Sequence, residues 1–171
     1  MDLPDFTAPS KNAEGFYPSD ISVDVEGDWF YKGNKIIRDD ILELFLNCIR
    51  LSSDNRFLIE WNRNLCSLEV ADTPFVIARV DRIKSDKKEG NIEEEIVLSL
   101  RHLSTKETLD PSTLYVGKEN VLYCRIRGGQ FPARFSRPAY YQLAEWIQED
   151  PESGDFCLEL NGIRNPIKMR E

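Results

Sequence analysis

Two stretches of this 171-residue chain repeat one another at a fixed displacement, which limits the available folds more than any other feature of the sequence. Residues 38–62 align with residues 137–161 without a gap, and the helical pattern, the loop length and the next strand coincide. The identical pairs are Arg38 and Arg137, Leu44 and Leu143, Phe57 and Phe156, Glu60 and Glu159, and Asn62 and Asn161. Agreement at several levels is typical of an internal repeat and predicts two related units.

Apolar residues at helical spacing predict one helix in each of these stretches. In residues 38–50 they occupy the i, i+3, i+4, i+7 and i+8 positions of a single buried stripe, at Ile41, Leu44, Phe45, Cys48 and Ile49. A second helix is predicted at about residues 137–149, with Ser136 as its N-cap and Pro151 ending it. Shorter runs of alternating apolar and polar residues surround both helices and indicate strands.

The predicted fold class is α+β. We expect two related β-rich units, each made of antiparallel strands with one helix packed on the sheet. Residues 1–18 are interpreted as an N-terminal arm, residues 19–86 as the first unit and residues 87–171 as the second. Ten of the fifteen residues between Asp81 and Glu95 are charged. This run predicts a solvated hairpin or linker that joins the units, with a docking patch as the alternative.

The charge balance argues against nucleic acid as a partner. With 22 basic and 30 acidic side chains, the protein is acidic and carries a net charge of -8, so it has no overall positive field for phosphate backbones. The first twelve residues lack the basic and apolar regions of a signal peptide, and no apolar stretch is long enough for a transmembrane helix. We therefore expect a cytoplasmic protein without a membrane partner.

The cysteines predict neither a metal site nor a cofactor. Cys48, Cys66, Cys124 and Cys157 are far apart in sequence, and His102 is the single histidine. A zinc site with four ligands is disfavoured by this spacing. We expect reduced, buried thiols, as in cytosolic proteins, although the even number also permits disulfides.

Three segments together resemble a known bacterial family. They are DISVDVEGDWFYKGNKIIRDDILELF, LEVADTPFVIARV and CRIRGGQFPARFSRPAYYQLAEW, which include a WxYxG strand and an R-x3-Y-x-L helix. From about residue 19 to the C-terminus, the sequence resembles the family called domain of unknown function 1285 (DUF1285). The resemblance implies a β-rich α+β fold with repeated motifs and a role in bacterial signal transduction. It implies no catalytic residues.

No motif in the chain predicts catalysis. Both glycine-rich phosphate-binding patterns are missing, and Gly128-Gly129-Gln130 is interpreted as a hairpin turn. Strand alternation would place His102 on the apolar face with Leu98 and Leu100, which favours a structural role over that of a catalytic base. We therefore expect that the protein is not an enzyme.

The candidate ligand-binding residues are aromatic and arginine side chains. Arg38 and Arg137 each lie at a helix N-terminus, where the helix dipole opposes a cation, so we expect a carboxylate partner within the same half. Glu60 and Glu159 are the candidates for these structural ion pairs. Arginines within apolar strands could instead bind an anionic ligand in a groove between the units. The candidates are Trp29, Tyr31, Arg38, Arg79 and Arg101.

Three functions remain open at the level of the sequence. The favoured one is a non-enzymatic regulatory module in signal transduction that binds a small anionic ligand or a protein partner. The alternative is an enzyme with an unrecognised site that acts on an anionic metabolite. A third is an assembly role through an exposed strand edge.

Overall fold

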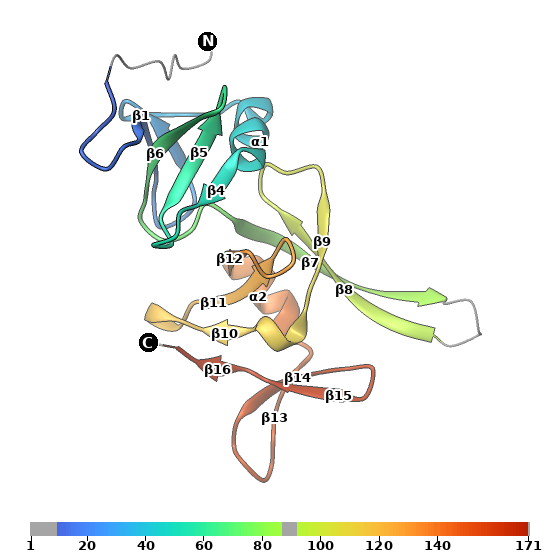
Figure 1. The fold of residues 1–171 in the computed structure, drawn as a ribbon. Helices are drawn as coiled ribbons and strands as arrows, with labels where there is room; N and C mark the ends of the chain where they lie inside the picture. The colour runs from blue at the N-terminus through green and yellow to red at the C-terminus, as the bar shows by residue number, and fades with distance from the viewer. Residues whose placement is uncertain (1–9, 87–91, 171) are drawn as a thin grey trace. The chain divides into compact units, whose positions relative to one another are not determined.

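The computed structural model describes residues 10–86 and 92–170 and shows a mixed α+β protein made mainly of strands (Figure 1). The chain divides into two compact units between Pro74 and Phe75. The sequence placed this division after residue 86, but strands β7 (Val76–Asp86) and β8 (Ile92–Leu100) form one antiparallel hairpin. Both strands of the charged segment therefore belong to the second unit, and residues 87–91 lie outside the described residues.

The first unit contains one mixed sheet and one helix. The strand order in its six-stranded sheet is β3-β2-β1-β6-β5-β4, and the pairing of β1 with β6 is parallel. The predicted all-antiparallel arrangement is therefore incorrect at this pair. The elements are β1 (Tyr17–Val23), β2 (Trp29–Tyr31), β3 (Asn34–Lys35), α1 (Asp39–Asn47), β4 (Ile49–Leu51), β5 (Phe57–Trp61) and β6 (Asn64–Val70).

Helix α1 buries one apolar face in the core of the first unit. Leu42, Phe45 and Leu46 are at most 1% exposed, and the ring of Trp29 stacks on Phe45 with 6.1 Å between centroids. Leu44, which was predicted to be in the buried stripe, is instead exposed. The helix ends at Asn47 rather than near residue 50, because the next residues form β4 and pair with β5.

The second unit contains a seven-stranded and a three-stranded sheet. Their strand orders are β16-β10-β11-β12-β7-β8-β9 and β13-β14-β15. Two pairs of neighbours, β7 with β12 and β10 with β16, are parallel. The remaining elements are β9 (Lys106–Thr108), the 3-10 helices η1 (Pro111–Thr113) and η2 (Lys118–Asn120), β10 (Tyr115–Val116), β11 (Leu122–Ile126), β12 (Phe131–Phe135), α2 (Arg137–Ala144), β13 (Ile147–Glu149), β14 (Phe156–Leu160), β15 (Ile163–Pro166) and β16 (Lys168–Met169).

Helix α2 begins as the sequence predicts and ends earlier. The hydroxyl of Ser136 accepts a hydrogen bond from the backbone N–H of Ala139 and caps the helix. Leu143, in the last turn of this helix, is fully buried. The predicted extension to residue 149 is incorrect, because Ile147–Glu149 forms β13 and pairs with β14.

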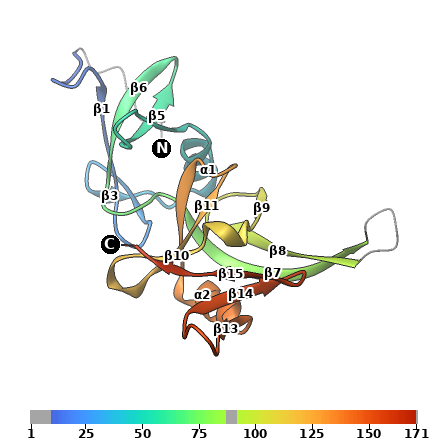
Figure 2. The same cartoon turned by 60° about the horizontal axis from the view of Figure 1, so that its bottom comes forward.

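The β7–β8 hairpin extends beyond the other strands of its sheet, as both ribbon views show (Figures 1 and 2). Strand β12 pairs with β7 at Val76 and Ile77, and β9 pairs with β8 at residues 97–99. The outer halves of β7 and β8 therefore have no strand neighbour except each other within the described ranges.

The two stretches that resemble each other contain the same local order of a helix, a short strand and a hairpin. Asn62 and Asn161 both begin a tight hairpin turn and have positive φ angles of 47° and 52°. Asparagine tolerates this left-handed backbone better than most residues, which explains its recurrence. The sheets around the hairpins differ, and a repeat of whole units is not confirmed.

In the described part of the chain, no helix has both the length and the apolar character needed to cross a membrane.

Candidate functional site

Trp29 and Tyr31, two of the predicted site residues, lie on β2 of the first unit. Trp29 is 1% exposed, and its Nε1 has no hydrogen-bond partner among the described residues. Tyr31 is half-buried, and the ammonium group of Lys32 lies 5.3 Å from its ring centroid. Trp29 is therefore a core residue, whereas Tyr31 lies at the edge of the core.

Arg38 forms an ion pair with a neighbour rather than with the predicted partner. Its Nη2 is 2.5 Å from Oδ2 of Asp40, and its Nε donates to Oδ1 of the same carboxylate at 3.0 Å. Hydrogen bonding to this guanidinium lowers the pKa of Asp40 and raises that of Arg38. Glu60 instead pairs with Arg50 at 2.8 Å. The predicted structural pair therefore exists for Arg38, but with a different carboxylate.

The equivalent pair in the second unit is not found. Arg137 is exposed and forms no ion pair with any residue that the structure describes. Glu159 lies 3.4 Å from Nε of Arg164, which also contacts Asp150 at 3.2 Å. Glu159 thus stabilises the β14–β15 hairpin instead of the start of α2.

Arg79 and Arg101 lie in the second unit. Nη2 and Nε of Arg79 are 2.6 and 2.9 Å from Oδ1 of Asp81, and hydrogen bonding to this carboxylate raises the pKa of Arg79. Arg101 follows the end of β8, where its backbone N–H donates to the carbonyl of Val76 at 2.8 Å. His102 lies in the turn after β8 with a φ of 60°, so the predicted strand alternation does not reach it.

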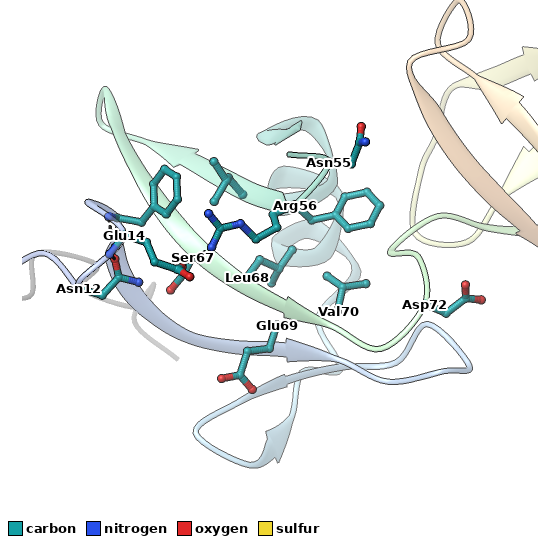
Figure 3. Close-up of a pocket in the computed structure, with 12 residues that line it drawn as sticks. Asn12, Glu14, Asn55, Arg56, Ser67, Leu68, Glu69, Val70 and Asp72 are labelled. Atoms are coloured by element: carbon teal, nitrogen blue, oxygen red, sulfur yellow. Dashed lines mark hydrogen bonds and ion pairs between the residues drawn. The ribbon is translucent and has the colours of Figure 1, made fainter. Parts of the chain in front are cut away.

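A pocket of about 580 Å³ lies in the first unit, between residues 12–16 and strands β5 and β6 (Figure 3). Its apolar lining residues are Phe16, Phe57, Leu58, Leu68 and Val70. The complete lining is Asn12, Glu14, Phe16, Asn55, Arg56, Phe57, Leu58, Ser67, Leu68, Glu69, Val70 and Asp72. Buried and half-buried strand residues therefore form the walls, and charged residues lie around them.

Residues 12–16 form one wall through a local turn. The side-chain oxygen of Asn12 accepts hydrogen bonds from the backbone N–H groups of Glu14 and Phe16 at 3.1 and 2.9 Å. The side chain thus replaces a backbone acceptor, as asparagine does in tight turns. This turn brings the carboxylate of Glu14 and the ring of Phe16 to Arg56.

Arg56 is the basic residue of the pocket, and its guanidinium is already paired. It forms an ion pair with Glu14 and a second one with Asp54, whose Oδ2 is 2.7 Å from its Nε. The guanidinium also lies 5.6 Å from the ring centroid of Phe16. Hydrogen bonding to Glu14 raises the pKa of Arg56, while the Ser52 hydroxyl holds the pKa of Asp54 low.

Carboxylates outnumber cations in this pocket. Figure 3 shows Arg56 reaching towards Glu14 at one end, Glu69 along β6 and Asp72 at the other end. Glu69 is exposed and forms no ion pair within the described ranges. The lining holds three carboxylates, Glu14, Glu69 and Asp72, and one guanidinium, so its formal charge is negative. The arrangement can accept hydrogen bonds from a cation beside an apolar wall.

Sequence reasoning did not identify this site. Glu69 and Asp72 both lie in the EVADTPF segment that supported the family resemblance, so this segment was the available signal. Glu14 falls in the predicted arm, and nothing in the sequence linked it to Arg56.

Comparison with solved structures identifies the fold. A DUF1285 family protein from Silicibacter pomeroyi DSS-3 superposes with a TM-score of 0.68 at 19% identity, over 95% of this chain and 90% of that protein. The chain has a DUF1285-type fold. A DUF1285 family protein from Shewanella baltica OS155 superposes with a TM-score of 0.59 at 16% identity, over 73% of this chain and 90% of that one. The resemblance drawn from the sequence is thus confirmed. The sequence matches no family model and no curated protein.

Proposed function

We propose that the protein is a non-enzymatic binding module whose first unit holds a small cationic ligand in the pocket beside β5 and β6. The ligand carries an ammonium or guanidinium group on an apolar body. The observation that carries this proposal is the excess of carboxylates over arginine in a pocket with apolar walls. Apolar lining with a few polar groups is the usual composition of ligand sites.

Each charged residue of the pocket has a distinct role in this proposal. Glu69 accepts hydrogen bonds from the cationic group, and Asp72 adds negative charge at the far end. Arg56 keeps Glu14 and Phe16 in place as a wall, because its guanidinium contacts both. Such charge-assisted hydrogen bonds are stronger than neutral ones.

This proposal changes the ligand class predicted from the sequence. Arg38 and Arg79 were candidates for an anionic ligand, but each already pairs with the aspartate two residues further along the chain. An anion at either arginine would compete with a carboxylate that is held permanently nearby. In the first-unit pocket, Glu69 forms no ion pair within the described ranges, so a cation at this carboxylate faces no such competition. A regulatory module of this kind agrees with the signalling role that the family resemblance implies.

A thermal-shift screen tests the proposal. The cationic set contains putrescine, agmatine, arginine methyl ester and phenethylamine, and the anionic set contains citrate, phosphate and nucleotides. A ligand at 100 times its dissociation constant adds roughly 2.7 kcal/mol of stability and raises the unfolding midpoint by several degrees. We expect such shifts from the cationic set, and we expect salt to weaken them because the carboxylates are near the surface.

Matched variants locate the site. Glu69→Gln alone should weaken the shift, and Glu69→Gln with Asp72→Asn should remove it. The control is Glu149→Gln with Asp155→Asn, which removes the same charge from exposed positions in the second unit. Equal shifts in both double variants would contradict the proposal, and shifts from anions alone would return support to the anionic ligand.

A further inference from the structure

A second cavity, of about 320 Å³, lies entirely within the second unit. Its lining comes from the β7–β8 hairpin on one side and from residues 145–162 on the other. The lining side chains that could contact a ligand include those of Arg82, Glu94, Trp146, Gln148, Glu159 and Asn161. Its volume is at the lower end of the range for small-molecule sites, so it suits one small ligand.

One aromatic ring is held rigidly in this cavity. Trp146 follows helix α2, and its backbone N–H donates to the carbonyl of Leu143 at 3.0 Å. The guanidinium of Arg82 lies 5.7 Å from the ring centroid. Arg82 in turn is fixed by Glu94, whose Oε2 accepts from its Nε at 3.0 Å, and both side chains are about three-quarters buried. Arg82 therefore covers one face of the Trp146 ring, and the half-buried ring contributes its remaining apolar surface to the lining.

The polar groups around the ring include both donors and acceptors. The side-chain amide of Asn161 is held by the backbone of Glu94 at 2.8 and 2.9 Å, and each of its polar atoms retains further hydrogen-bonding capacity. Gln148 supplies another amide, and Glu159 supplies a carboxylate that Arg164 orients at 3.4 Å. Planar groups of both kinds suit a ligand whose own groups donate and accept.

Sugar hydroxyls have this property, since each is at once a donor and an acceptor. A sugar ring also has an apolar C–H face that packs on an aromatic side chain. A simple cation would leave the donors of Asn161 and Gln148 unused. An anion would meet three lining carboxylates, Glu94, Glu145 and Glu159, against the one guanidinium of Arg82. We propose that this cavity is a binding site for a neutral saccharide, with the sugar ring against Trp146 and its hydroxyls on Gln148, Glu159 and Asn161.

This site is independent of the cationic site proposed for the first unit. The two cavities share no residue and select different chemistry. A variant that loses cation binding in the first unit therefore still allows saccharide binding in the second unit to be measured, and the reverse holds as well.

Saturation-transfer difference NMR on the 171-residue protein tests the proposal. The probes are glucose, galactose, mannose, N-acetylglucosamine, maltose and cellobiose, with glycerol and putrescine as comparison compounds. We expect transfer to the ring C–H protons of at least one saccharide and none to glycerol. Trp146→Ala should abolish the signal, and Gln148→Ala, an exposed change, should weaken binding at least five-fold.

A tryptophan in the first unit provides the control variant. Trp61→Ala removes a half-buried tryptophan in the first unit and should leave saccharide binding unchanged. The Gln148→Ala variant keeps the test decisive if Trp146→Ala fails to fold. The proposal is overturned if no saccharide gives a signal, if the Trp146 and Gln148 variants bind as well as the wild type, or if putrescine alone binds in a manner that depends on Trp146.

Discussion

The side-chain amide of Asn161 forms two hydrogen bonds with the backbone of Glu94. Its Nδ2 donates to the carbonyl oxygen at 2.9 Å, and its Oδ1 accepts from the N–H at 2.8 Å. The amide thus imitates a neighbouring strand at the open edge of β8 and connects the β14–β15 hairpin to a strand 67 residues earlier in the chain. This contact fixes one wall of the second-unit cavity.

Asn161→Asp tests this contact. The substitution keeps the shape and tolerates the left-handed turn, but it replaces a donor by a carboxylate that faces the Glu94 carbonyl. A lost hydrogen bond costs about 1 to 2 kcal/mol, so the unfolding midpoint should fall by about 2 to 8 °C. Asn62→Asp is the matched control, because Asn62 has the same φ region and its side chain makes no hydrogen bond among the described residues. Equal effects of the two changes would contradict the account.

Gln142 closes the edge of β7 beyond the end of β12. Its Oε1 accepts from the backbone N–H of Val80 at 2.9 Å. Gln142→Ala should leave this half-buried donor unsatisfied and lower the free energy of unfolding by about 1 to 3 kcal/mol. Gln142→Glu keeps an acceptor and should cost less. Hydrogen exchange at the Val80 amide gives the most local measurement, and unchanged protection in the alanine variant would refute the role of Gln142.

Gly117 makes room for a tyrosine ring. A Cβ atom at this position would lie 2.8 Å from Cε2 of Tyr123, which is 8% exposed and stacks on Tyr115. The φ of Gly117 is -101°, which other residues adopt freely, so the effect of Gly117→Ala is one of packing. We expect a loss of about 1 to 3 kcal/mol in denaturant unfolding. Combining it with Tyr123→Leu should cost less than the sum of the single changes, and strict additivity would argue against the clash.

The cysteine thiols should differ in reactivity. Burial raises the pKa of the Cys124 thiol to about 12, whereas Cys48 is only half-buried. Because the thiolate is the reactive form, an alkylating reagent at pH 8 should label Cys48 first and Cys124 only after unfolding. Mass spectrometry of time points measures the order, and labelling of native Cys124 as fast as Cys48 would contradict it.

The same burial predicts a stability change at high pH. In the unfolded chain Cys124 loses its proton near its ordinary pKa of 9, and in the folded chain only near 12. The contribution of the protonated Cys124 thiol to the free energy of unfolding is therefore complete below pH 9. It declines as the pH rises from 9 to 12. Cys124→Ala should flatten this part of the pH profile relative to the wild type.

Local patterns predicted the fold class and the helix starts, but long-range pairing set the helix ends. Ser136 caps α2 as predicted. Residues 49–51 and 147–149 continue a helical pattern in the sequence, yet both segments pair as strands with residues far outside a helical turn. Which partner strand is available depends on the tertiary fold, so periodicity alone cannot show it.

In the candidate site, too, local contacts could be predicted from the sequence and long-range contacts could not. Arg38 and Arg79 are each followed two residues later by an aspartate, a pattern visible in the sequence that indicates local pairing. The pocket, by contrast, depends on Glu14 reaching Arg56, and the adjoining chain is positioned by the parallel pairing of β1 with β6. Contacts of this kind leave no periodic signal.

The central claim is that the first-unit pocket binds a cation. Two-dimensional ¹H–¹⁵N NMR of the labelled protein, titrated with agmatine and separately with citrate, tests it most directly. The account predicts that agmatine shifts the amide signals of residues 12–16, 55–58 and 67–72, that Glu69→Gln weakens this response, and that citrate leaves these signals in place. Shifts caused by citrate near Arg38 or Arg79, with no response of the pocket to agmatine, would contradict it.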